Sequence, residues 1–290
     1  MNFKDRLKGC LIYGAIGDSI GGKYEGTPSN QAIDFNFGWS ISDDTQLTLA
    51  TCEAIFDSEK IKPEKVAARF LDWYNRRKLT GLGSSTLKAL RELQMGGHWA
   101  LVGRSGEGAA GNGAAMRIAP LAFKRQVDKQ TIKDICTITH KNDEAYTGAL
   151  AVYYSIVRAL SEDWHGNNNL IEKIVDELPD TKVKDRIVEL DKLEDLTIAE
   201  IGFRYKPTGY VVDSVPISIF AAQKISQIDI KEIFAELIKV GGDTDTTCSM
   251  TGQIIGSLIG ERGMPNDWND KFGKLGIRES IDNLVANWKE

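Results

Sequence analysis

The sequence predicts an all-α protein, and three features of the chain support this. Apolar residues recur three or four positions apart in most segments of the 290 residues, as they do on one face of an α-helix. No segment alternates apolar and polar residues in the manner of a half-buried strand. Two clusters of carboxylates and hydroxyls stand just ahead of helix-like segments, where such residues are favoured. We therefore expect helices whose connecting loops converge at one end of the molecule.

The expected elements follow one another without a repeat or a dividing linker. A helix over residues 3–18 ends at a glycine-rich turn, and a loop over residues 21–40 follows it. A short β-branched run ends at Pro216, after which a helix resumes. The other segments with helical spacing cover residues 43–57, 66–74, 87–93, 145–156, 170–178, 183–190, 217–225 and 230–237, with one closing helix near the C-terminus. We expect residues 1–290 to form a single domain.

The most informative stretch is VGGDTDTTCSMTGQIIGSLIG, residues 240–260. Two carboxylates, Asp243 and Asp245, alternate there with threonine hydroxyls and open an uncharged helical run. Behind them a glycine recurs every four residues from Gly252 to Gly260, which leaves one helix face without side chains. Such a face predicts that another backbone approaches this helix closely.

A second cluster of the same kind, Ser42-Asp43-Asp44-Thr45, opens another helical segment. Helix capping is the simplest interpretation of either cluster, because Ser, Thr and Asp are preferred at helix starts. A cap needs one side-chain oxygen, whereas the two clusters together supply four carboxylates and several hydroxyls. Oxygen ligands of this type are those that Mg²⁺ and Mn²⁺ prefer. We therefore favour a site for two metal ions over capping alone.

Four further features are candidates for function. Asp18 extends the apolar face of the first helix, so it is either satisfied by the glycine-rich turn after it or points into a site, where it would contact substrate. Glu25 would ordinarily be a solvated charge, and it is of interest because it lies between site candidates. His140 precedes a helix, where a structural role is more common than ligand contact. The glycine-rich residues 104–120 can expose backbone N–H groups to phosphate, although they match neither the P-loop nor the dinucleotide fingerprint.

Composition narrows the class of protein. The formal net charge is −5 and charges of both signs are spread along the chain, so we expect no nucleic-acid partner. The four cysteines are isolated in helical segments and indicate small buried residues in a reducing compartment. No cleavable leader or membrane span stands out, and no long apolar stripe suggests a subunit interface. We expect a cytoplasmic, soluble monomer without a membrane partner.

Five stretches give the chain a specific resemblance. In order they read GAIGDSIGGKYEG, SDDTQLTLA, GNGAAMRIAP, TGYVVDSVP and GGDTDTTCSMTGQIIG. They resemble the successive motifs of the ADP-ribosylglycohydrolase family, which includes dinitrogenase reductase-activating glycohydrolase. The likeness covers nearly the whole chain, and the SDDT and GGDTDT motifs are its most specific part. It implies a compact orthogonal helical bundle with two adjacent Mg²⁺ or Mn²⁺ ions in a cleft.

The resemblance also assigns roles to residues of this sequence. Glu25 matches a mobile glutamate loop that covers the metals, and His140 and Tyr210 would lie near the ADP part of a substrate. The implied diphosphate and distal-ribose loop comprises Gly111, Asn112 and Gly113. The implied metal ligands are Ser42, Asp43, Asp44, Asp243, Asp245 and Thr246, and none of them is missing.

The activity implied by the resemblance is hydrolysis of the glycosidic bond at ribose C1″ of ADP-ribose linked to a protein side chain, with arginine as the favoured acceptor. Asp44, Asp245 or Glu25 would transfer the protons that this reaction needs. The alternatives within the class are serine-ADP-ribose, O-acetyl-ADP-ribose and poly(ADP-ribose). Outside it they are a non-catalytic ADP-ribose-binding protein, which the intact ligand set disfavours, and a phosphohydrolase that releases AMP.

Overall fold

In a computed structural model the chain is almost entirely α-helical, which confirms the predicted fold class. The structure describes residues 2–27, 32–262 and 264–289, so residues 28–31 of the expected loop lie outside the described part. Its helices are α1 (Phe3–Gly22), α2 (Asp43–Ile55), α3 (Pro63–Asn75), α4 (Ser84–Gln94), α5 (Lys129–Thr137), α6 (Asp143–Leu160), α7 (Leu170–Ile174), α8 (Lys182–Asp191), α9 (Ile198–Tyr205), α10 (Val211–Ala222), α11 (Ile230–Val240), α12 (Thr244–Ile259), α13 (Asn266–Lys274) and α14 (Arg278–Ala286). The short 3₁₀ turns are η1 (Glu107–Ala109), η2 (Asn112–Ala114), η3 (Ala119–Phe123), η4 (Val175–Glu177) and η5 (Gln223–Ser226).

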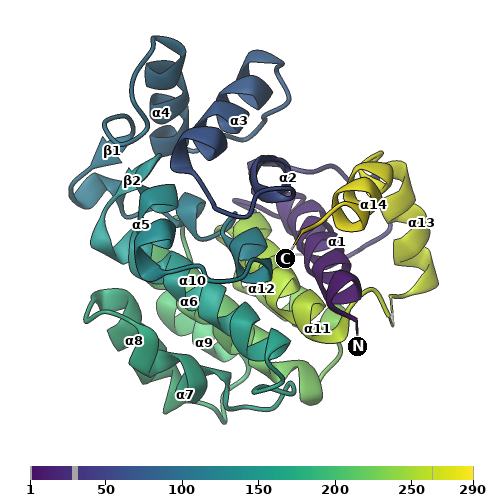
Figure 1. Cartoon of the computed structure of the whole chain (residues 1–290). Coiled ribbons are helices and arrows are strands. Elements are labelled where there is room, and N and C mark those ends of the chain that lie inside the picture. The colour runs from purple at the N-terminus through teal and green to yellow at the C-terminus, as the bar shows by residue number, and fades with distance from the viewer. Residues whose placement is uncertain (1, 28–31, 263, 290) are drawn as a thin grey trace.

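Helices α1 and α12 form a closely packed pair in the middle of the molecule (Figure 1). A Cβ atom placed on Gly256 would lie 2.2 Å from the carbonyl oxygen of Gly9, and one on Gly17 would lie 2.2 Å from that of Cys248. No other residue type fits at such distances, so the glycines allow backbone to lie directly on backbone. The predicted face of α12 without side chains is therefore confirmed. Its consequence is that the end of α1 lies against the beginning of α12.

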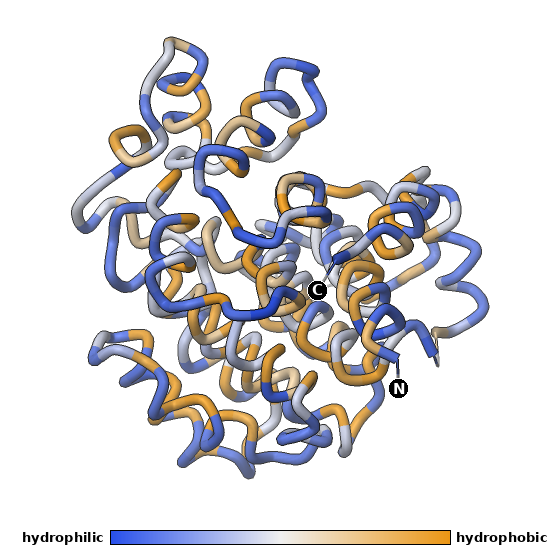
Figure 2. Tube along the Cα trace, viewed as in Figure 1, coloured by the Kyte–Doolittle hydropathy of each residue, from blue (hydrophilic) through white to orange (hydrophobic). Residues whose placement is uncertain are grey.

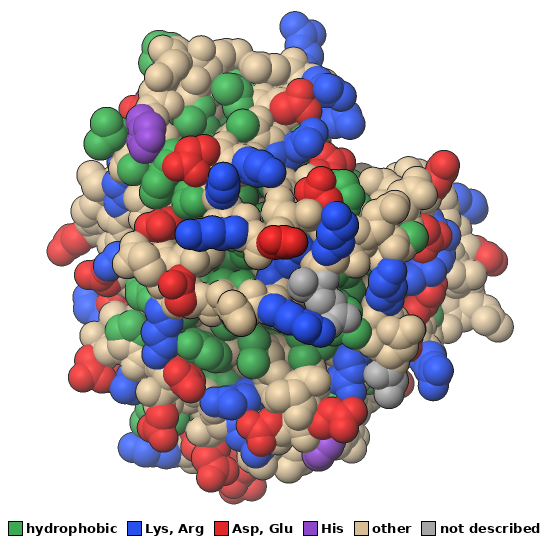
Figure 3. Space-filling view, in the orientation of Figure 1, with side chains coloured by type: hydrophobic (Ala, Val, Ile, Leu, Met, Phe, Trp, Pro, Cys, Tyr) green, Lys and Arg blue, Asp and Glu red, His purple; other side chains and the backbone are tan. Residues whose placement is uncertain are grey.

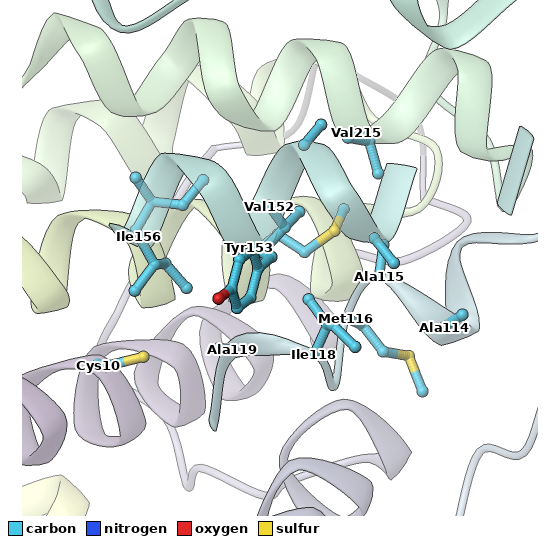
Figure 4. Packing of buried hydrophobic residues seen from close by; sticks show 14 of the residues in the cluster. Cys10, Ala114, Ala115, Met116, Ile118, Ala119, Val152, Tyr153, Ile156 and Val215 are labelled. Carbon is cyan, nitrogen blue, oxygen red and sulfur yellow. The ribbon is translucent and has the colours of Figure 1, made fainter. Parts of the chain in front are cut away.

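Helices α6 and α10 pack on α12 and complete the core. The tube in Figure 2 shows apolar residues gathered on the inner sides of these helices. Figure 4 shows Val152 and Ile156 of α6 in the same buried cluster as Met116 of the glycine-rich segment and Cys10 of α1. All four cysteines are free and buried, as expected, and burial raises the pKa of Cys10, Cys52, Cys136 and Cys248 above the usual thiol value.

The remaining elements lie around this core (Figure 1). Helices α3 and α4 stand together at one end, next to two parallel strands of two residues each, β1 (Arg104–Ser105) and β2 (His140–Lys141). Helices α13 and α14 lie against α1. None of the helices in the described ranges has the length and apolar character needed to cross a bilayer. Charged side chains of both signs are scattered over the face shown in Figure 3.

The structure corrects the sequence-based expectations at several places. Helix α1 continues to Gly22, and the C-terminal region forms two helices rather than one. The β-branched run before Pro216 is helical, because α10 extends through this proline. Pro216 removes one backbone hydrogen bond from α10, whereas Val211, Val215 and Ile219 are buried. Burial outweighs the local propensity there. The strands are too short to show alternation.

Candidate active site

The N-terminal ends of α2, α4 and α12 meet at a cleft of about 530 Å³. The glycine-rich loop before α5 and the turn after α1 complete its lining. Ten of the residues predicted for the site line the cleft: Glu25, Asp43, Asp44, Gly111, Asn112, Gly113, His140, Asp243, Asp245 and Thr246. The polar loops therefore converge as the sequence predicted. We call the carboxylates Glu25, Asp43, Asp44, Asp243 and Asp245 the acidic wall, and Gly111, Asn112, Gly113 and His140 the glycine wall.

The two predicted clusters are in direct contact. The Thr246 hydroxyl donates a hydrogen bond of 3.2 Å to Asp44 Oδ2, although the two residues are 202 positions apart. The Ser42 hydroxyl lies 3.3 Å from the same oxygen. Thr246 also donates its backbone N–H to Asp245 Oδ1 at 2.8 Å. The contact between α1 and α12 thus brings the beginnings of α2 and α12 into one site.

Asp18 lies behind the acidic wall and does not line the cleft in the described structure. Its carboxylate accepts the backbone N–H groups of Ser42 (3.0 Å) and Thr45 (3.2 Å), together with both of their hydroxyls. The partner of Asp18 is therefore the beginning of α2 rather than the glycine-rich turn that the sequence suggested. Only 1% of the residue is exposed, and burial raises its pKa against the lowering effect of these hydrogen bonds. The geometry makes Asp18 a positioning residue.

Asp243 occupies the N-cap position of α12, yet its side chain makes no capping hydrogen bond. Instead, the Asn112 amide donates to Asp243 Oδ2 at 2.7 Å and also lies 3.1 Å from Ser214 Oγ. Capping therefore does not explain the Asp243 carboxylate, which is oriented toward the cleft by the glycine wall. The turn before it requires glycine at Gly242, where φ is +79° and a Cβ would lie 1.9 Å from the Pro207 carbonyl oxygen.

Several carboxylates of the acidic wall have raised pKa values. Burial, followed by the neighbouring Asp18 charge, raises the pKa of Asp43 to about 7. Burial and hydrogen bonding to Asp243 raise the pKa of Asp245 to about 9, and burial with the Asp245 charge raises the pKa of Asp44 well above its usual value. Asp44 Oδ1 is buried without a hydrogen-bond partner in the described part of the chain. Buried carboxylates need protons or cations, so this wall suits divalent metal ions.

Two groups of carboxylates have ligand atoms within 4.8 Å of one another. One is Asp18, Asp44 and Asp245, and the other is Glu25, Asp243 and Asp245, so Asp245 belongs to both. This geometry could hold cations on either side of Asp245. Asp43 lines the cleft outside these groups and accepts the backbone N–H of Gly83. The six-residue ligand set remains a prediction, while the fit of the acidic wall to hard cations rests on the geometry.

Glu25 lies at the exposed edge of the cleft, just after α1. Its turn is held by a hydrogen bond of 3.3 Å from Gly26 N–H to the Gly242 carbonyl, and by the Tyr24 hydroxyl on Asp34 O at 2.8 Å. Partial burial and the charge of Asp243 raise the pKa of Glu25. A carboxyl with a raised pKa at the mouth of the cleft can give a proton to a group arriving from solvent.

The glycine wall is built closely around His140. A Cβ on Gly111 would lie 3.1 Å from His140 Nε2, and one on Gly113 would lie 2.9 Å from Cε1. Burial and the charge of Arg117 lower the pKa of His140 to about 3, so the ring is neutral. Tyr210 does not line the cleft, and its backbone pairs with Gly111 instead. Tyr210 therefore supports the glycine loop through its main chain.

Sequence reasoning missed the beginning of α4. Ser84, Ser85 and Thr86 line the cleft, and Gly83 precedes them. The signal was the stretch GLGSST, a glycine-rich turn followed by hydroxyl residues, but the first turn of α4 has no apolar residue and the helix was expected to begin at Leu87. Met116, Thr208 and Gly209 also line the cleft, and they lie within the motifs GNGAAMRIAP and TGYVVDSVP, although none of the three was singled out.

Comparison with known proteins identifies the family. The family model described as ADP-ribosylglycohydrolase matches residues 1–290. The chain is 25% identical to ADP-ribosylhydrolase ARH3 of Xenopus tropicalis, over 96% of this chain and 93% of that protein. It is 24% identical to ADP-ribosylhydrolase ARH3 of Homo sapiens, over 91% of this chain and 88% of that protein. A solved structure titled "ADP-ribosylglycohydrolase-related protein complex" shares the fold with a TM-score of 0.67 and 25% identity, covering 98% of this chain and 97% of that chain. The chain therefore belongs to the ADP-ribosylglycohydrolase family.

Proposed function

We propose that this protein is a metal-dependent hydrolase that cleaves the glycosidic bond at ribose C1″ of ADP-ribose attached to a protein side chain or a small molecule. The observation that carries the proposal is the contact between Thr246 and Asp44, which joins two carboxylate clusters at one cleft. Family membership supplies the reaction class. The cleft is large enough for one end of such a ligand to meet the acidic wall while the other end meets the glycine wall.

Asp44, Asp243 and Asp245 would hold two Mg²⁺ or Mn²⁺ ions, with Ser42, Asp43 and Thr246 completing or orienting the ligand set. These ions, when bound, would polarise the vicinal ribose hydroxyls and lower the pKa of a water molecule. Cleavage at C1″ passes through an oxocarbenium-like ribose, so the departing acceptor needs a proton. We assign that proton to Glu25, because it lies at the mouth of the cleft whereas Asp44 and Asp245 are buried.

We propose arginine as the acceptor that this site prefers. Asp243 lies beside Glu25 at the edge of the cleft, and its negative charge favours a cationic guanidinium there while Glu25 holds the proton. Serine-linked ADP-ribose and O-acetyl-ADP-ribose are the rival substrates, because an uncharged acceptor gains nothing from this edge. The ARH3 relatives are named ADP-ribosylhydrolases without an acceptor in the name, so linkage needs a direct test.

The test is release of ADP-ribose from an arginine-ADP-ribosylated peptide and, in parallel, from a serine-linked peptide, in Mg²⁺, in Mn²⁺ and after EDTA. Metal-dependent release from the arginine peptide alone supports the proposal in full. Release from the serine peptide alone would support the proposed reaction and identify serine instead of arginine as the acceptor. AMP as the product would identify a phosphohydrolase, and ADP-ribose binding without release from any substrate would identify a binding protein.

The assembly state belongs to the same proposal. We propose a single domain of residues 1–290 that acts as a monomer in the cytoplasm. Light scattering of the purified chain checks the mass against 32.0 kDa for one copy. A stable dimer in solution would contradict the monomer.

A further inference from the structure

Arg117 is a buried cation that the proposed chemistry leaves unexplained. It lies just after the glycine wall, and 0% of its surface is exposed. Its guanidinium carbon lies 5.1 Å from the centre of the Phe70 ring. Within the ranges that the structure describes, no carboxylate forms an ion pair with it. Burying an unpaired charge costs free energy of folding, so we expect Arg117 to have a functional role.

The guanidinium joins the two parts of the glycine wall. Arg117 Nη1 donates to the carbonyl oxygen of Gly113. Nη2 donates to Thr139 Oγ1 at 2.9 Å and to the Ile135 carbonyl oxygen at 3.3 Å. Gly113 belongs to the glycine loop and Thr139 directly precedes β2, so one side chain fixes the loop relative to the histidine.

The contact with Thr139 also determines where His140 carries its proton. Thr139 Oγ1 accepts from Arg117 and lies 2.7 Å from His140 Nδ1. Thr139 is fully buried, and among the described residues its hydroxyl has no acceptor besides this ring nitrogen. The hydroxyl therefore donates to Nδ1, which leaves the proton of the neutral ring on Nε2. Nε2 is the nitrogen that faces Gly111 at the cleft.

We propose that Arg117 is a positioning residue that makes the glycine wall selective for the anionic diphosphate of the substrate. No carboxylate of the described residues forms an ion pair with it, and Asp43 interacts with its charge only at longer range, so it gives this wall a positive potential. Through Thr139 it also presents the Nε2–H donor of His140 to the cleft. The first turn of α4 lies on the same side, with Thr86 Oγ1 3.5 Å from a Cβ position at Gly113. The carboxylates of the acidic wall suit cations and ribose hydroxyls rather than phosphate oxygens, which leaves the glycine wall for the diphosphate. This inference rests on the proposed function.

The binding experiment compares ADP-ribose with adenosine, which lacks the diphosphate, by isothermal titration calorimetry on the metal-loaded protein. Removing the charge with Arg117→Gln is expected to weaken ADP-ribose binding by roughly tenfold, equivalent to about 1.4 kcal/mol. Adenosine binding should stay within about twofold and, in turnover assays, KM should rise with kcat little changed. Arg117→Lys keeps the charge and should recover most of the affinity. Equal losses for both ligands in both variants would overturn the inference and leave Arg117 a support of the fold.

A second measurement leaves the buried arginine unchanged, and its first part needs no ligand. Nitrogen-15 NMR of the wild-type protein should show His140 as the Nε2–H tautomer, with His140→Gln as the control that assigns the signal. In Thr139→Val, which keeps Arg117, the ring should become a mixture of tautomers and ADP-ribose should bind several-fold more weakly. An Nδ1–H tautomer in the wild type would overturn the inference. Absence of ADP-ribose binding with the Nε2–H tautomer in place would instead count against the proposed function.

Discussion

The acidic wall and the glycine wall face the same cleft but are built by opposite means. Side chains make the acidic wall, and burial followed by their mutual repulsion raises the pKa of its carboxylates, so that cations or protons must neutralise them. Backbone makes most of the glycine wall, together with the neutral His140, and the buried Arg117 lies behind it. A ligand that is rich in hydroxyls at one end and anionic at the other can satisfy both walls at once. The difference between the walls therefore selects a type of ligand that neither would select alone.

The largest expected effect comes from Asp245, which belongs to both groups of carboxylates. Asp245→Asn should abolish tight binding of divalent ions and reduce turnover by more than about 10³-fold, because metal-bound water and ribose positioning both depend on it. Calorimetric titration with Mn²⁺ and the peptide assay measure the two effects. The matched control is Asp270→Asn, an exposed carboxylate away from the cleft, which should change neither. Retained activity in the Asp245 variant would break the two-metal proposal.

A substitution of Glu25 should impair proton transfer while metal binding is largely retained. Glu25→Gln keeps the shape of the side chain and removes its proton donor, so turnover should fall by roughly 10²- to 10⁴-fold. Binding of at least one ion should persist, since Asp18, Asp44 and Asp245 are untouched. Glu279→Gln, at another exposed glutamate, serves as the control in the same kinetic assay. Unchanged turnover at Glu25 would move the proton donor to a buried carboxylate.

The acidic wall depends on the contact between α1 and α12, and Gly256 tests that dependence. Gly256→Ala places a methyl group 2.2 Å from the Gly9 carbonyl oxygen, and it should reduce the free energy of unfolding by about 3 kcal/mol or more. Gly273→Ala is the matched control in helix α13, where a Cβ meets no atom within 4 Å. That control should be neutral or stabilising by about 0.5–1 kcal/mol. Urea unfolding measures both, and equal stability would contradict the close approach.

A substitution of Asp18 tests whether this residue, which lies behind the acidic wall, contributes to the stability of the fold or to ligand binding. Asp18→Asn puts an amide against groups that donate to the carboxylate, so the free energy of unfolding should fall by about 1–3 kcal/mol. Affinity of the metal-free protein for ADP-ribose should change little, because the side chain does not line the cleft; the metal-free state is used because Asp18 also belongs to one candidate cation group. Thermal unfolding and calorimetry distinguish these effects. Loss of ADP-ribose binding at unchanged stability would restore the substrate contact that the sequence suggested.

The smallest effect is a pH dependence of the metal-free protein. The folded-state pKa values of Asp43 (about 7) and Asp245 (about 9) lie above the usual value of about 3.9 for an unfolded aspartate. Their protons therefore contribute stability that is complete below about pH 4 and lost as the pH rises through 7 and 9. Mg²⁺ displaces those protons, so the gain in Tm with Mg²⁺ relative to EDTA should be larger at pH 8 than at pH 5. Equal gains would show that the carboxylates are already ionised.

Local pattern was enough for much of the fold and for the acidic wall. Helical spacing predicted most helices, and the bare face from Gly252 predicted the close approach of another backbone, which the structure shows to be that of α1. The two carboxylate clusters were recognised because each is short and dense in oxygen. Their meeting could be expected but not measured, since it depends on a contact that spans most of the chain.

The features that sequence reasoning missed are those defined by distant partners. Asp18 was expected either to be satisfied by its own turn or to point into a site and contact substrate, but its donors come from α2. In the sequence, Arg117 is a single charged residue within GNGAAMRIAP. Only the fold shows that it is fully buried between Gly113 and Thr139. Pro216 signalled an interruption because propensity is local, whereas burial of α10 is decided by the whole core.

The pairing of α1 with α12 sets an order of events during protein synthesis. Asp18, Ser42 and Asp44 leave the ribosome early, whereas Thr244, Asp245 and Thr246 follow about two hundred residues later. A nascent chain can form α2 and the glycine loop well before the acidic wall exists. The cleft is therefore completed only when nearly all of the chain has been translated. A truncated product that ends before α12 would lack both its central helix pair and a carboxylate shared by the two candidate cation positions.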